Sequence, residues 1–160
     1  MKTYDELKAL IEKRGVHAEF GEPGESWGIE QNPHELATFL VRCQELGVQS
    51  VLEIGTGYKG GLSRFLAQDM GWDVTTYDVQ NYGHAFEKVH YIVGDGRWVI
   101  SRDEWFDLVF IDGDHSYQSV HDDYYDYAFH ARKVQAFHDI AGLRNCEGVK
   151  QMWFELVDTY

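Results

Sequence analysis

Acidic residues and histidines stand at, or just past, the ends of five short apolar segments of the chain. These residues are Glu53, Asp78, Asp95, Asp112 with Asp114 and His115, and His138 with Asp139. Carboxylates and imidazoles gathered at one place could bind a divalent cation, hold a positively charged ligand or transfer a proton. Surface acids have no reason to collect at strand ends by chance, so this pattern is the main indication of function.

A glycine-rich stretch follows the first apolar segment. Gly55, Gly57 and Gly60 spell G-x-G-x-x-G, and Asp78 follows at the distance expected of a ribose-binding acid. Three interpretations stay open: the pyrophosphate of a dinucleotide, the amino-acid and ribose parts of a nucleoside cofactor, or a tight turn without a ligand. Glu53 favours the second, because a carboxylate opposes a pyrophosphate but suits an ammonium or sulfonium group.

The five apolar segments predict strands that would bring these residues to one edge. The segments are apolar on both faces, and stretches with a helical pattern connect them near residues 60–70 and 116–130, which is typical of a parallel sheet covered by helices. We therefore expect an α/β fold in one domain, residues 1–160, with a Rossmann-like, doubly wound parallel sheet of about five strands. In such a sheet the ligand lies beyond the carboxyl ends of the strands, where strand order reverses. The expected strands are residues 50–54, 73–78, 88–93, 106–112 and 133–138.

Helix signals flank the predicted sheet. Thr3 and Glu6 form a capping box, and Asn32 followed by Pro33 is a second helix start. A third helical pattern closes the chain. The expected helices are residues 3–14, 32–47 and 146–158.

Composition and charge exclude several classes of function. The formal net charge of −13 would repel a phosphate backbone, so neither DNA nor RNA is an expected partner. No apolar run approaches 18 residues and the amino terminus lacks the apolar core of a signal peptide, so no membrane contact is expected. Cys43 and Cys146 fall in expected helices and are interpreted as reduced, buried thiols. We expect a soluble cytoplasmic protein.

The stretch VLEIGTG, together with the acid that closes the second strand and the Gly94-Asp95 pair, resembles class I S-adenosylmethionine-dependent methyltransferases. In that family the acid of the second strand binds the ribose hydroxyls and the Gly-Asp pair contacts the adenine. Trp98 would stack on or flank the adenine, with a place in the core as the equal alternative. The cofactor-binding residues that the resemblance implies are Glu53, Gly55, Thr56, Gly57, Asp78, Asp95 and Trp98.

The segments FDLVFIDGDHSYQSVHDDY and FHDI resemble a narrower branch, the small-molecule O-methyltransferases related to cation-dependent catechol and caffeoyl-coenzyme A enzymes. The resemblance implies a metal site made of Asp112, His138 and Asp139 for Mg²⁺, Mn²⁺ or Fe²⁺, and a small hydroxylated acceptor. With Asp112 as its catalytic partner, His115 stands where relatives carry a basic lysine and is the expected base. The alternative for His115 is to cap the following helix or to orient Asp112.

The chain also departs from this family. Lys59 replaces the third glycine of the loop, and two further strands that usually end the sheet are missing, so a truncated class I methyltransferase fold is expected. The fifth strand would then be an edge that the last helix covers or a second copy pairs with, as in a homodimer. The alternative functions are a non-catalytic S-adenosylmethionine-binding module and a nicotinamide-dependent oxidoreductase.

Overall fold

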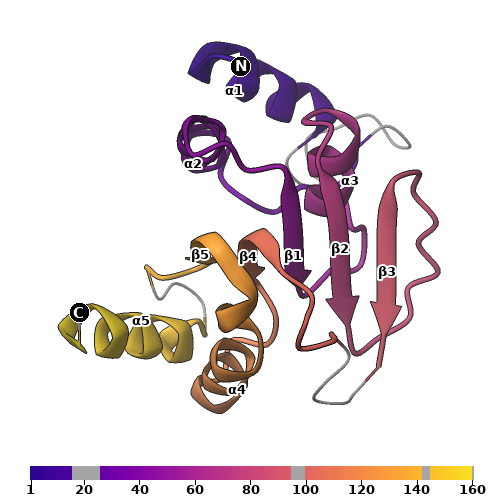
Figure 1. The fold of residues 1–160 in the computed structure, drawn as a ribbon. Helices are drawn as coiled ribbons and strands as arrows, with labels where there is room; N and C mark the ends of the chain where they lie inside the picture. The colour runs from indigo at the N-terminus through magenta and orange to yellow at the C-terminus, as the bar shows by residue number, and fades with distance from the viewer. Residues whose placement is uncertain (16–25, 95–99, 142–144, 160) are drawn as a thin grey trace.

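A computed structural model of the chain describes residues 1–15, 26–94, 100–141 and 145–159. Within them five strands form one sheet in which every neighbouring pair is parallel, in the order β3-β2-β1-β4-β5. The predicted Rossmann-like parallel sheet of five strands is confirmed (Figure 1). The strands are β1 (Ser50–Ile54), β2 (Asp73–Asp78), β3 (Val89–Val93), β4 (Phe106–Ile111) and β5 (Ala131–Phe137).

Helices cover both faces of this sheet. One buried apolar cluster joins the first three helices to one face, and a second lies between the opposite face and the fourth helix (Figure 1). A third cluster joins the last two helices to each other. The sheet is therefore doubly wound, as predicted. The helices are α1 (Tyr4–Arg14), α2 (Pro33–Glu45), α3 (Gly61–Gln68), α4 (Tyr117–Tyr127) and α5 (Glu147–Thr159), with a 3₁₀ turn at Ala128–His130.

The predicted helix starts are present. Thr3 and Glu6 exchange the two hydrogen bonds of a capping box at α1, and the side chain of Asn32 accepts hydrogen bonds from two backbone amides at the start of α2. Ser116 is the N-cap of α4, where its side chain accepts from the amide of Ser119. These caps satisfy amides that have no partner within the helix, so local sequence fixes where each helix begins.

Alternation along β1 explains how one strand serves both faces. Val51 belongs to the cluster under α2 and α3, whereas Leu52 and Ile54 belong to the cluster under α4. All three side chains are buried. The strand therefore contributes to two cores, and its carboxyl end is held firmly between β2 and β4.

The winding reverses between β1 and β4. The chain leaves β1 through α3 to reach β2 on one side, and leaves β4 through α4 to reach β5 on the other. The backbone amide of Asp112 donates to the carbonyl of Ile54, and that of His138 donates to the carbonyl of Ile111, so sheet hydrogen bonding continues one residue past each strand. This point is where a doubly wound sheet binds its ligand.

Strand β5 lies at one edge of the sheet, as predicted. Helix α5 packs mainly on α4, through a cluster that contains Val120, Val149 and Met152. Among the described residues, no helix combines the length and the apolar character needed to cross a membrane.

Candidate functional site

A cavity of about 460 Å³ opens at the carboxyl ends of β1, β2, β4 and β5. This volume is in the range of small-molecule and cofactor sites. Its lining brings together the residues that the sequence singled out and that the structure describes, whereas predicted contacts Asp95 and Trp98 lie outside the described residues. The predicted residues that line the cavity are Glu53, Gly55, Thr56, Gly57, Asp78, Asp112, Asp114, His115, His138 and Asp139.

Gly55 and Gly57 are required for different reasons. Gly55 has a φ of 94°, and a Cβ atom on it would lie 2.1 Å from the carbonyl oxygen of Asp112. Gly57 has a φ of 68°, but a Cβ atom there would meet nothing within 4 Å. Glycine is therefore required at position 55 because the loops after β1 and β4 touch there. At Gly57 the bare backbone faces the cavity, where a ligand can approach closely.

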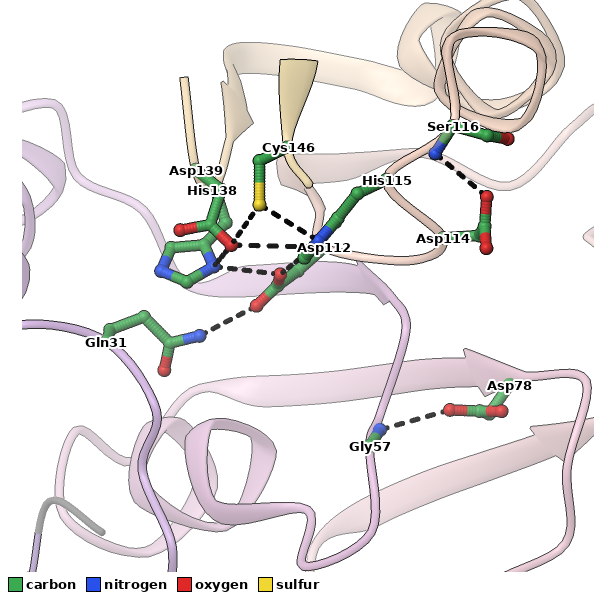
Figure 2. Close-up of polar contacts among 10 residues, drawn as sticks. All are labelled: Gln31, Gly57, Asp78, Asp112, Asp114, His115, Ser116, His138, Asp139 and Cys146. Atoms are coloured by element: carbon green, nitrogen blue, oxygen red, sulfur yellow. Dashed lines mark hydrogen bonds and ion pairs between the residues drawn. The ribbon is translucent and has the colours of Figure 1, made fainter. Parts of the chain in front are cut away.

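Asp78 ends β2 with its carboxylate fixed toward the glycine loop. One oxygen, Oδ2, accepts a hydrogen bond from the amide of Gly57 at 3.0 Å (Figure 2), and Oδ1 accepts from the amide of Gln80 at 2.8 Å. Each oxygen keeps a further lone pair. The carboxylate is therefore oriented in advance to accept hydrogen bonds from paired hydroxyl groups of a ligand.

Glu53 lies beneath the loop and is only 2% exposed. Its Oε2 accepts hydrogen bonds from the hydroxyls of Ser63 and Thr76, the latter at 2.8 Å, and Thr76 is in turn 2.7 Å from the hydroxyl of Thr56. Burial raises the pKa of Glu53 to about 8, against the lowering effect of these hydrogen bonds. Glu53 therefore lines the cavity and also accepts the hydrogen bonds of a buried network that connects β1, β2 and α3. The Thr56 hydroxyl belongs to that network.

On the opposite side of the cavity, the ends of β4 and β5 bring the predicted metal residues together (Figure 2). His138 Nδ1 is 2.9 Å from Asp112 Oδ1 and 3.4 Å from Asp139 Oδ2. These three residues offer one ligand atom each, all within 4.8 Å of one another. An oxygen-rich set with one imidazole fits Mg²⁺, Mn²⁺ or Fe²⁺, so the residues present match the predicted group.

His115 approaches this cluster from the loop before α4. Its Nε2 is 3.5 Å from Asp139 Oδ2 and 3.8 Å from Asp112 Oδ1. Since Ser116 caps α4, and Asp114 accepts a hydrogen bond from the Ser116 amide, the alternative in which His115 caps that helix is wrong. His115 is in position to exchange a proton in the cavity or to orient Asp112.

The neighbouring carboxylates raise the pKa of both histidines. The Asp112 carboxylate, 3.8 Å from the ring, and the charge of Asp139 raise the pKa of His115 above its ordinary value. Burial acts to lower the pKa of His138, but its hydrogen bond to Asp112 and the charges of Asp112 and Asp139 outweigh burial and raise the pKa. Both carboxylates therefore stabilise the protonated form of each imidazole.

Gln31 is a member of the site that the sequence did not reveal. Its Nε2 donates to Asp112 Oδ2 at 2.7 Å, while its Oε1 is buried and has no hydrogen-bond partner among the described residues. The residue also lines the cavity. A buried acceptor without a donor is costly. A ligand with an ammonium or hydroxyl group would satisfy it, which supports a polar ligand beside Asp112.

Cys146 is the second member that the sequence missed. It stands directly before α5, is 3% exposed, and its Sγ is 3.1 Å from His115 Nδ1 and 3.4 Å from Asp139 Oδ2. Burial and the Asp139 carboxylate raise the pKa of the thiol to about 11. Both cysteines are buried, as predicted, but the position of Cys146 within the cluster could not be expected from a thiol in a helix-like segment.

Comparison with known proteins gives a distant likeness only. No protein-family model matches the sequence, and no curated protein matches it. Among solved structures, the chain is similar to two of the plantazolicin methyltransferase BpumL, in complex with a pentazolic or a triazolic desmethylPZN analog and SAH. The identities are 17% and 18% and the TM-scores 0.34 and 0.35, over 68% of this chain. The matched part covers 49% of each BpumL chain, about half its length. A likeness at this level carries no information about activity.

Proposed function

We propose that this protein is an S-adenosylmethionine-dependent methyltransferase that acts on a hydroxyl group of a small molecule with the help of a divalent cation. One observation carries the proposal: the glycine loop with Asp78, and the cluster of Asp112, His138 and Asp139, face each other across a single cavity. One side suits a nucleoside cofactor and the other suits an ion that would hold a reacting oxygen.

On the cofactor side, the carboxylate of Asp78, fixed by two backbone amides, would accept hydrogen bonds from the two ribose hydroxyls. The bare backbone at Gly57 would leave room for the amino-acid and sulfur parts of the cofactor. The aspartates of the cavity lining, Asp78, Asp112 and Asp139 among them, favour a cation over a pyrophosphate. S-adenosylmethionine, with its ammonium and sulfonium groups, matches these properties better than a nicotinamide dinucleotide.

On the ion side, Asp112, His138 and Asp139 would hold the cation. A bound divalent cation lowers the pKa of an acceptor hydroxyl and fixes its oxygen. His115 would then take the hydroxyl proton, and the oxygen would displace the sulfur from the methyl carbon. The products are a methyl ether, S-adenosylhomocysteine and a proton that leaves through His115.

Partners and location follow from charge and from the sheet edge. We expect no nucleic-acid partner, because the net charge is −13. We expect a homodimer through strand β5, which lies at the edge of the sheet. Helix α5 packs mainly on α4 and not along this edge, so a second copy could pair with it. A cytoplasmic location agrees with two reduced cysteines.

The test is a methyl-transfer assay with a panel of small hydroxylated acceptors. The purified protein is mixed with S-adenosylmethionine, with and without Mg²⁺ or Mn²⁺, and released S-adenosylhomocysteine is measured. We expect release that depends on both acceptor and cation and is lost in Asp112→Asn. If the sample with a chelator releases as much S-adenosylhomocysteine as the sample with added cation, the metal has no part in the reaction. Cofactor binding without release for any acceptor would favour a non-catalytic module.

A further inference from the structure

A sulfur atom lies within the ion-binding cluster, and the proposed methyl transfer makes no use of it. Cys146 Sγ is 3.1 Å from His115 Nδ1 and 3.4 Å from Asp139 Oδ2, and His115 Nε2 is 3.5 Å from the same Asp139 oxygen (Figure 2). The three residues offer one sulfur, one nitrogen and one oxygen ligand atom, all within 4.8 Å of one another.

We propose that His115, Asp139 and Cys146 form a site for a thiophilic divalent ion of the Zn²⁺ class. Zn²⁺ binds sulfur at about 2.3 Å and nitrogen or oxygen at about 2.0–2.2 Å, so ligand atoms of a tetrahedral site lie roughly 3.3–3.6 Å apart. The sulfur of Cys146 is 3.1 Å from His115 Nδ1 and 3.4 Å from Asp139 Oδ2, and both separations are close to this spacing. One ligand atom from each of the three residues lies within 4.8 Å of the other two. Thiolate and imidazole together select such an ion over Mg²⁺, which prefers oxygen.

Exposure supports an ion site over a nucleophilic thiol. Cys146 is 3% exposed, so a substrate cannot reach its sulfur without displacing neighbouring groups. The side chains of His115 and Asp139 are 34% and 32% exposed, and both line the cavity. An ion can therefore enter from the cavity and bind the buried sulfur of Cys146 together with the two partly exposed side chains. Its fourth coordination position would remain open to water.

This site overlaps the oxygen-rich one through a single residue. Asp139 belongs to both groups, whereas Cys146 and His115 belong to one and Asp112 and His138 to the other. The two ions therefore compete for one carboxylate. Binding of the thiophilic ion would also occupy His115, and if the proposed function holds, that ion inhibits methyl transfer. Only this last consequence rests on the proposed function.

The test measures ion binding by the protein alone, without cofactor or acceptor. Calorimetry with Zn²⁺ is paired with absorption spectra of the Co²⁺-loaded protein, in which a bound thiolate gives an intense charge-transfer band. We expect a strong band and Zn²⁺ binding in the wild type. In Cys146→Ala the band should be absent and Zn²⁺ binding at least about tenfold weaker. Cys146→Ser, which keeps the shape of the side chain, should also lack the band.

Two matched variants locate the effect. Cys43 is the other buried cysteine, in α2, and Cys43→Ala should keep both the band and the Zn²⁺ affinity. Asp112→Asn should weaken Mn²⁺ binding yet keep the band. Thermal unfolding of each metal-free variant checks that it is folded. A wild type without the band, or a folded Cys146→Ala with unchanged Zn²⁺ affinity, would overturn the inference whatever the outcome of the methyl-transfer assay.

Discussion

The two sides of the cavity are built in different ways. The β1–β2 side, with Gly55, Gly57 and Asp78, presents backbone and one carboxylate that two amides already hold. The β4–β5 side consists of ionisable side chains crowded around Asp112 and Asp139. The first side is complete without a ligand, whereas the second holds an excess of carboxylates that a cation would balance.

Substitutions on the two sides of the cavity should therefore have different effects. On the β1–β2 side the shape of the backbone matters, so a substitution acts through folding or close contact. On the β4–β5 side the carboxylates repel one another and are relieved by protonated histidines or a cation, so a substitution that removes one charge should alter ion binding with little effect on the fold.

The largest expected effect is a loss of stability that distinguishes Gly55 from Gly57. Gly55→Ala should lower the free energy of unfolding by about 3 kcal/mol, because the new Cβ would lie 2.1 Å from a backbone oxygen. Gly57→Ala, with open space around it, should cost about 1 kcal/mol of backbone strain but prevent S-adenosylmethionine from binding. Chemical denaturation and calorimetry measure the two effects. Equal loss of stability in both variants would show that the loop is not open at Gly57.

The next effect concerns the ion. Asp112→Asn should weaken Mn²⁺ binding at least about tenfold, because a charged ligand is lost from the cluster. The affinity for S-adenosylhomocysteine should stay within about twofold of the wild type. Titration of each ligand in separate experiments checks this. Loss of both affinities together would mean that the two sides of the cavity are not independent.

A matched change on the other side should show the reverse. Asp78→Ala should weaken S-adenosylhomocysteine binding by about 2 kcal/mol, or ~30-fold, since hydrogen bonds to a carboxylate are lost. Mn²⁺ binding should be unchanged. Asp73→Ala, at the exposed other end of the same strand, is the control and should alter neither affinity. A weaker ion affinity in Asp78→Ala would contradict the division between the sides.

The last prediction concerns a gradual pH dependence of stability. Glu53 has a pKa of about 8 in the fold, against 4.5 for an ordinary glutamate. The folded protein therefore binds more protons than the unfolded chain in this window, and its stability is fully present below about pH 4.5 and falls as pH rises toward 8. The slope from this one group is at most about 1.4 kcal/mol per pH unit.

The variant Glu53→Gln keeps a hydrogen-bond acceptor for Ser63 and Thr76 but cannot ionise. Denaturant unfolding at several pH values should give a flatter stability profile for Glu53→Gln than for the wild type between pH 4.5 and 8. Parallel profiles would show that Glu53 is not protonated in the fold.

Local patterns predicted the framework of the site well. The bounds of β1 and β2 and the caps at Thr3 and Asn32 agree with the sequence, because capping and apolar runs are local properties. The convergence of Asp78, Asp112 and Asp139 also followed, since parallel strands end at one edge.

Contacts between distant segments could not be predicted in the same way. Gln31 meets Asp112 across 81 positions of the chain, and Cys146 reaches His115 only because α5 packs on α4. Glu53 lies on the same face of β1 as Val51, which is the face covered by α2 and α3. Its carboxylate therefore meets the hydroxyl of Ser63 in α3. These outcomes depend on packing partners that no local pattern specifies.

Calorimetry with S-adenosylhomocysteine and with NAD, each titrated into the wild-type protein, tests the proposed cofactor most directly. We expect one S-adenosylhomocysteine per chain and no heat from NAD beyond dilution, with the S-adenosylhomocysteine signal much weakened in Asp78→Ala. Binding of NAD with no binding of S-adenosylhomocysteine would contradict the proposal and make the cavity a dinucleotide site.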